Sequence, residues 1–157
     1  MSIRDSSGSE SDNWAIKGTA LAKKEFGNHI ITSSVEHAAV SNSVRALENL
    51  GFRVTVLPVD KNGQVNPEDL KEALDKETIL VSIMGVNNEI GTIQPIKAIS
   101  KVLENYPNVT FHVDNVQALG KDVWDEVFTD RVDLMSLSAH KFHAPRGVGI
   151  LYKKKVK

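Results

Sequence analysis

The segment TILVSIMGVNNEIG, residues 78–91, decides the fold class of this chain. Its first half is apolar and mostly β-branched, which is typical of a strand buried on both faces of a parallel sheet. Its second half contains asparagine and glycine, which predict a turn directly after the strand. A strand of this kind needs neighbouring strands beside it and helices packed over the sheet.

Strands and helices alternate along the rest of the sequence. Further strands are predicted over residues 29–34, 53–59, 109–114, 132–138 and 147–153. Apolar residues at helical spacing predict helices over residues 11–26, 38–50, 66–75 and 95–105. In the first of these helices, Trp14, Leu21 and Phe26 provide the spacing. This alternation predicts a layered α/β domain with a mainly parallel sheet.

The composition is that of one ordinary globular domain, with 157 residues, 41% hydrophobic and 25% charged. A net charge of -1 gives no reason to expect nucleic acid, and the lysine-rich end, residues 153–157, is expected to be a solvated tail. We find no apolar signal core and no run of membrane-spanning length, so the cytoplasm is the expected location. The chain has no cysteine, which excludes a disulfide, a thiolate metal site and a cysteine nucleophile within it.

Polar side chains follow four of the predicted strands. In parallel sheets, ligands gather at the carboxyl ends of the strands, so these side chains are candidates for a common site. The candidates at these four strand ends are Glu36, His37, Asn87, Asn88, Asp114, Asn115, Gln117, Ser138, His140 and Lys141. One lysine, one carboxylate, two histidines, an amide pair and hydroxyl groups together suit a flat, anionic, nitrogen-containing ligand.

Each candidate also has an ordinary structural explanation. Asp114 could cap a helix, His37 could be a core or capping histidine, and Asn88 could supply turn chemistry before Gly91. A metal site is a further alternative, with His37, His112, Asp114, His140 and His143 as its candidate ligands. It is disfavoured because His140 and His143 face differently, so no open-site ligand triad emerges.

Five segments, taken in order, resemble the NifS/IscS-type cysteine desulfurases, which are class V, fold-type I enzymes that use pyridoxal 5'-phosphate (PLP). These segments are SESDNWAIKG, TSSVEHAAV, TILVSIMGVNNEIGTIQPI, FHVDNVQALGK and DLMSLSAHKFHAPRGVGILY. The resemblance implies the three-layer major domain of a PLP transferase, with a mainly parallel sheet and helices on both faces, here truncated. The NNEIG segment favours the NifS/IscS branch over the SufS and selenocysteine-lyase branch.

The resemblance also implies roles for residues around the PLP ring. Lys141 would form the Schiff base and then act as acid and base, and Asp114 would pair with the pyridine nitrogen. Gln117 would hydrogen-bond the phenolic oxygen of the ring. His37 would stack on the ring face as a second catalytic residue, and Asn88 would lie near the substrate carboxylate and the phenolic oxygen.

The phosphate of PLP would be held by Ser9, Ser138 and His140. Ser9 lies near the start of a helix, where N–H groups and the helix dipole favour an anion. Pro145 with Gly147 would turn the chain back toward the sheet. His143 and Arg146 are expected to be structural.

Family members are longer, and their other half carries the small domain, the loop with the persulfide-forming cysteine and the arginine that binds the substrate carboxylate. We therefore expect residues 1–157 to be an incomplete major domain that lacks desulfurase activity alone. The parent would be a homodimer that converts L-cysteine to L-alanine and passes sulfur to an iron–sulfur scaffold or tRNA-thiolation protein. Another class V activity, such as an aminotransferase or selenocysteine lyase, or a non-catalytic remnant, is the alternative.

Overall fold

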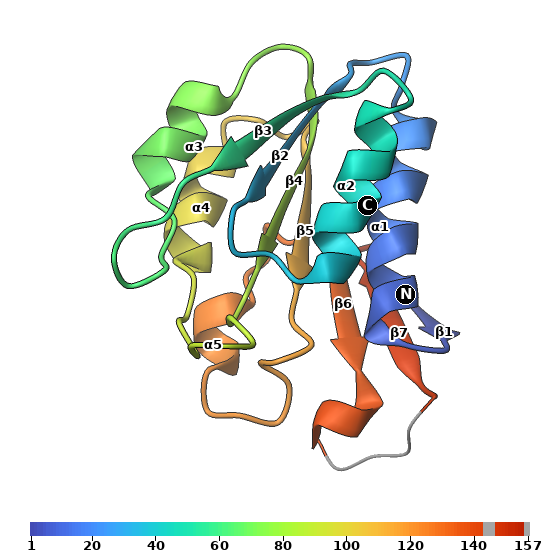
Figure 1. Ribbon diagram of the computed structural model, residues 1–157, viewed down its shortest axis with the longest axis vertical. Coiled ribbons are helices and arrows are strands. Elements are labelled where there is room, and N and C mark those ends of the chain that lie inside the picture. The colour runs from blue at the N-terminus through green and yellow to red at the C-terminus, as the bar shows by residue number, and fades with distance from the viewer. Residues whose placement is uncertain (143–146, 156–157) are drawn as a thin grey trace.

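The computed structural model describes residues 1–142 and 147–155, so the expectations for His143, Pro145 and Arg146 fall outside the described residues. The strands are β1 (Ser2–Asp5), β2 (His29–Ser33), β3 (Arg53–Leu57), β4 (Thr78–Met84), β5 (Thr110–Asp114), β6 (Leu134–Ser138) and β7 (Gly149–Lys153). They form one sheet in the order β1-β7-β6-β5-β4-β2-β3 (Figure 1). The five strands from β6 to β3 run parallel, whereas β7 is antiparallel to both β6 and β1.

Helices cover both faces of this sheet. They are α1 (Gly8–Ala22), α2 (Ala38–Glu48), α3 (Pro67–Ala73), α4 (Ile96–Leu103) and α5 (Trp124–Val127), followed by a 3₁₀ turn, η1 (Ala139–Phe142). Helices α1 and α2 pack together on one face, and α3 and α4 lie on the other with α5 next to α4 (Figure 1). The predicted three-layer α/β architecture with a mainly parallel sheet is therefore confirmed.

The apolar core lies on both sides of β4, as its sequence predicted. All seven residues of this strand are buried. Leu80 belongs to the core under α1 and α2, whereas Val81 and Ile83 belong to the core under α3 and α4. Successive side chains of a strand point to opposite faces, so a strand buried on both sides is apolar at nearly every position.

The apolar residues whose spacing predicted the first helix do not form its buried face. Trp14, Leu21 and Phe26 are 52%, 57% and 76% exposed, and the helix ends at Ala22 rather than at residue 26. The face that packs on the sheet carries small and polar residues together with one large apolar residue, Ile16. In the described part of the chain, no helix has the length and apolar character needed to cross a membrane.

Candidate functional site

A cavity of about 290 Å³ lies at the carboxyl ends of β4, β5 and β6, next to the first turn of α1. The residues that the resemblance placed around PLP all line this cavity: Ser9, His37, Asn88, Asp114, Gln117, Ser138, His140 and Lys141. The other strand-end candidates, Glu36, Asn87 and Asn115, do not line it. The strand register explains how the central part of the set meets. Met84 at the end of β4 is aligned with Asp114 at the end of β5, which is aligned with Ser136 of β6.

Asp114 is the last residue of β5 and is 5% exposed. Its Oδ1 accepts a hydrogen bond from the backbone N–H of Val116 at 3.0 Å, which closes a turn and does not cap a helix. Burial raises the pKa of Asp114, while the Val116 bond and the nearby His37 oppose that shift. A positively charged partner inside the cavity would therefore stabilise the ionised form of this carboxyl group.

His37 is exposed and is the N-cap residue of α2. Its Nδ1 accepts a hydrogen bond from the backbone N–H of Ala39 at 3.1 Å, so the interpretation as a capping histidine is confirmed. The same side chain lines the cavity, and the cap therefore fixes the imidazole where it faces the site.

A polar wall is formed by the first turn of α1 and the segment after β6. Ser7 caps α1, and its Oγ accepts a hydrogen bond from the backbone N–H of Glu10 at 3.2 Å. Ser138, the last residue of β6, lies next to this turn, and its Oγ is 2.9 Å from Nδ1 of His140. Hydroxyl and imidazole groups beside the positive end of a long helix provide a suitable environment for a phosphate group.

The turn after β4 places Asn88 at the cavity, but Asn87 supplies the turn chemistry. The Oδ1 of Asn87 accepts hydrogen bonds from the backbone N–H groups of Glu89 at 2.9 Å and Ile90 at 3.0 Å. Asn88 is exposed and lines the cavity. The assignment of the turn role to Asn88 is therefore wrong by one residue, since Asn87 makes these bonds.

Two acids near the cavity had no predicted role, the buried Asp12 and the half-buried Glu36. Asp12 on α1 is 1% exposed and lines the cavity; burial, together with the Asp114 carboxyl, raises the pKa of Asp12 to about 9. Burial raises the pKa of Glu36 to about 8. The sequence contains one signal for Asp12, which shares a helical face with Ala15 and Ile16. An acidic residue on the buried face of a helix is unusual and points to a special role.

The described residues include no group of three or more histidine, aspartate or glutamate side chains that could hold a metal ion. His112, one of the candidate metal ligands, has both ring nitrogens within hydrogen-bonding distance of serine hydroxyl groups. Its Nδ1 lies 2.8 Å from Ser82 Oγ, and its Nε2 lies 2.9 Å from Ser136 Oγ. This histidine is therefore engaged in a structural network within the sheet.

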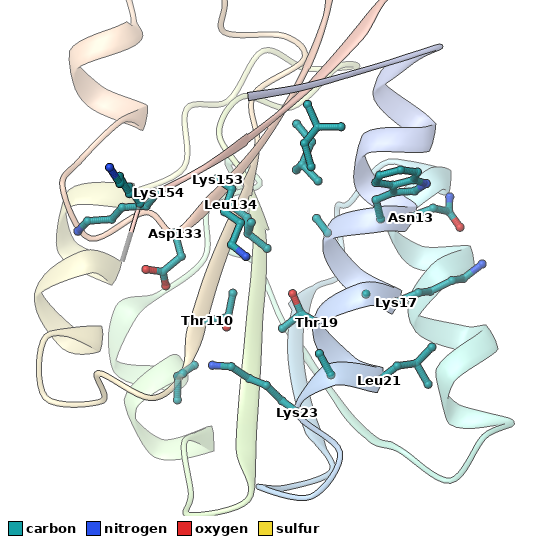
Figure 2. Close-up of a pocket in the computed structure, with 18 of the residues that line it drawn as sticks. Asn13, Lys17, Thr19, Leu21, Lys23, Thr110, Asp133, Leu134, Lys153 and Lys154 are labelled. Carbon is teal, nitrogen blue, oxygen red and sulfur yellow. The ribbon is translucent and has the colours of Figure 1, made fainter. Parts of the chain in front are cut away.

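A larger groove of about 1320 Å³ lies at the opposite end of the parallel strands, between α1 and the strands β5, β6 and β7 (Figure 2). Lysines border it, and Lys23 reaches from the end of α1 toward Thr110 (Figure 2). None of the predicted site residues lines this groove. The smaller cavity, at the carboxyl ends of the strands, is therefore the candidate functional site.

Comparison with known proteins gives a consistent family signal. The family model for class-V aminotransferases matches residues 5–157. A NifS/IcsS protein homolog of Lactobacillus delbrueckii subsp. bulgaricus is 76% identical over 150 residues, which are 96% of this chain and 39% of that protein. The cysteine desulfurase IscS of Dictyoglomus turgidum is 55% identical over 153 residues, 98% of this chain and 38% of that protein.

Solved structures resemble the chain in the same way. A NifS-like protein superimposes with a TM-score of 0.90 at 40% identity, over 98% of this chain and 42% of that one. DndA from Streptomyces lividans gives a TM-score of 0.91 at 37% identity, over 99% of this chain and 43% of that one. The chain thus spans about two fifths of the length of the proteins it matches.

Proposed function

Because the chain belongs to the class-V aminotransferase family, we propose that it forms the PLP-binding part of a cysteine desulfurase. The observation that carries this proposal is that all of the residues predicted to surround PLP line one cavity at the strand ends. High identity to proteins named NifS/IcsS homolog and cysteine desulfurase IscS supports the choice of reaction. The full protein would convert L-cysteine to L-alanine and retain the sulfur as an enzyme-bound persulfide.

The residues present fit PLP on structural grounds. A protonated ring nitrogen would stabilise the ionised form of the buried Asp114, because burial otherwise disfavours the charge on this carboxyl group. The backbone at Gly8 lies so close to the cavity wall that a Cβ there would meet Val116 Cγ2 at 2.6 Å. Ser9, Ser138 and His140 supply polar groups beside the helix N-terminus for the phosphate.

When bound, PLP supplies an electron sink for negative charge that develops at the substrate carbon. The Lys141 amine would hold the cofactor covalently and, once substrate displaces it, move the proton at that carbon. Asp114 would keep the ring nitrogen protonated, and Gln117 would donate a hydrogen bond to the phenolic oxygen. His37, held by its cap on α2, would stack on the ring, and Asn88 would position the substrate carboxylate.

The sulfur-transfer step needs a thiol that these 157 residues do not contain, since the chain has no cysteine. We therefore propose that this chain alone binds PLP and does not release sulfide from L-cysteine. A related solved structure, SspA, is described as a complex with cysteine, which supports L-cysteine as the substrate of the full protein. The family resemblance supports a cytoplasmic homodimer and a sulfur-acceptor protein of the iron–sulfur scaffold or tRNA-thiolation type.

Titration of the folded chain with PLP tests the proposal. Attachment to Lys141 gives an absorbance band near the visible edge, and Lys141→Ala abolishes that band. Lys121→Ala, which replaces an exposed lysine away from the cavity, is the control and retains the band. Folded protein that shows no band, or a Lys141→Ala protein that keeps it, would contradict the proposal.

A further inference from the structure

Asp12 is a second buried acid in the wall of the candidate cavity, besides Asp114. It lies on α1, one turn after Ser9, and its side chain faces the sheet with 1% of the residue exposed. Its Oδ1 is buried and has no hydrogen-bond partner within the described residues. A buried carboxylate oxygen without a partner is costly, so either a missing donor or a proton on the carboxyl group itself must account for it.

His112 is the nearest basic group and does not act as that donor. Its Nε2 lies 3.7 Å from Asp12 Oδ1, which is longer than a hydrogen bond. Both ring nitrogens are instead engaged by Ser82 and Ser136, an arrangement that a neutral imidazole satisfies with one donor and one acceptor. Burial lowers the pKa of His112 to about 3, so the ring brings no positive charge to Asp12.

The other charges that act on Asp12 are negative. Asp114 at the end of β5, Glu36 after β2 and Asp5 at the end of β1 all disfavour its ionisation. The basic groups of the cavity are His37, His140 and Lys141, on α2 and on η1 after β6. Of these, His37 acts on Asp114, where it favours the charged form.

We propose that Asp12 is a positioning residue that keeps its proton while Asp114 ionises, so that this part of the cavity carries one negative charge rather than two. Two nearby buried carboxyl groups resist ionising together, and the one in contact with a cation ionises first. One negative charge matches one protonated ring nitrogen. The cofactor part of this inference rests on the proposed function, whereas the neutral state of Asp12 does not.

Thermal unfolding of the full chain without PLP tests the protonation state directly. Burial beside the Asp114 carboxyl raises the pKa of Asp12 in the fold from its ordinary value of 3.8 to about 9. Between these values the unfolded chain loses a proton that the folded chain retains, so the stability of the wild type falls as the pH rises. Asp12→Asn mimics the neutral acid and removes this loss. Its Tm relative to wild type therefore increases from pH 5 to pH 9, by about 5 °C or more.

Asp122→Asn is the matched control because Asp122 is exposed, and its Tm difference from wild type stays constant with pH. If Asp12→Asn fails to fold, the smaller neutral variant Asp12→Ser is measured in the same way. A Tm difference for Asp12 variants that also stays constant between pH 5 and pH 9 overturns the inference, because Asp12 would then be ionised throughout that range.

A second measurement connects Asp12 to the cofactor. In the PLP-loaded wild type, ionisation of Asp12 adds a second negative charge to the cavity, so the absorbance of the bound cofactor changes with pH in the alkaline range. In Asp12→Asn the midpoint of this profile moves by about one pH unit or the change disappears. Identical profiles overturn the positioning role. If the wild type binds no PLP, the proposed function fails, and the unfolding comparison still decides the state of Asp12.

Discussion

The carboxyl group of Glu36 accepts a hydrogen bond from the backbone N–H of Met84 at 3.0 Å. Its Oε1 also accepts from the Ser33 hydroxyl group at 2.5 Å, so one side chain ties the ends of β2 and β4 together. Strand β4 ends at the candidate cavity, which Met84 lines. Glu36, which directly precedes His37 in the sequence, therefore links the end of β2 to the end of β4 beside the cavity.

Replacement of Glu36 separates the role of its shape from the role of its charge. Burial raises the pKa of Glu36 to about 8, so the folded chain holds it protonated at pH 7. Glu36→Gln keeps an acceptor for Met84 and is expected to match or exceed wild-type stability at pH 7. Glu36→Ala leaves a buried N–H unpaired and is expected to lower the free energy of unfolding by about 1–3 kcal/mol.

Urea unfolding at pH 5, 7 and 8.5 measures both variants. The stability of wild type relative to Glu36→Gln should fall as the pH rises toward 8, because the unfolded chain releases a proton that folded Glu36 retains. Equal losses for Glu36→Gln and Glu36→Ala at pH 7 would mean that Glu36 is ionised in the fold.

Asp114→Asn tests the charge that the cavity offers to a cofactor. An asparagine can still accept the hydrogen bond from Val116, so the turn after β5 is expected to persist. The variant loses the carboxylate, and a hydrogen bond to a charged group is worth about 1.5–3 kcal/mol. We therefore expect PLP affinity to fall about tenfold or more in a titration followed by absorbance. Unchanged affinity would show that Asp114 does not contact the ring nitrogen.

The sequence predicted best what depends on continuous apolar runs and on strand ends. The run at residues 78–84 is buried at every position, and most of the polar candidates at the strand ends line one cavity. Parallel pairing explains this success, because it aligns the carboxyl ends of strands that are distant in the chain. Asn88 and Asn87 could not be told apart, since only backbone geometry decides which of two adjacent amides closes a turn.

What the sequence missed depends on packing against distant elements. The edge strand Ser2–Asp5 has only four residues, and its positions are exposed or half-buried. It therefore lacks the apolar run that identifies a strand in the sequence. The four-residue helix Trp124–Val127 is too short for a helical period. In the first helix, large side chains suggested the buried face, yet α1 packs through small and polar residues such as Asp12 and Ala15. Close packing against a polar part of the sheet selects small residues there.

The corrected helix face makes a direct prediction. Trp14 is 52% exposed and Ile16 is fully buried on the same helix. Trp14→Ser is expected to change the free energy of unfolding by no more than about 0.5 kcal/mol. Ile16→Ala removes buried methyl groups and is expected to cost about 2–5 kcal/mol. Urea unfolding of both variants checks this, and a larger loss for Trp14→Ser than for Ile16→Ala would restore the original interpretation.

Gly8 offers the sharpest test of the cavity wall, because the same helix provides its control. A Cβ at Gly8 would lie 2.6 Å from Val116 Cγ2 and 3.3 Å from Ser138 Cβ, whereas a Cβ at Gly18 meets nothing within 4 Å. Gly18→Ala is expected to stabilise the chain by about 0.5–1 kcal/mol through helix propensity. Gly8→Ala forces the wall to move, so we expect it to lower both stability and PLP affinity.

The double variant Gly8→Ala/Val116→Ala identifies the cause of that loss. Removing the Val116 methyl groups eliminates the closest contact, while the Ser138 contact remains tight. Part of the PLP affinity lost in Gly8→Ala should therefore return in the double variant, measured by the same absorbance titration. If Gly8→Ala binds PLP as wild type does, the first turn of α1 does not border the cofactor. If the double variant shows no recovery, the loss arises from the helix start and not from a clash with the turn after β5.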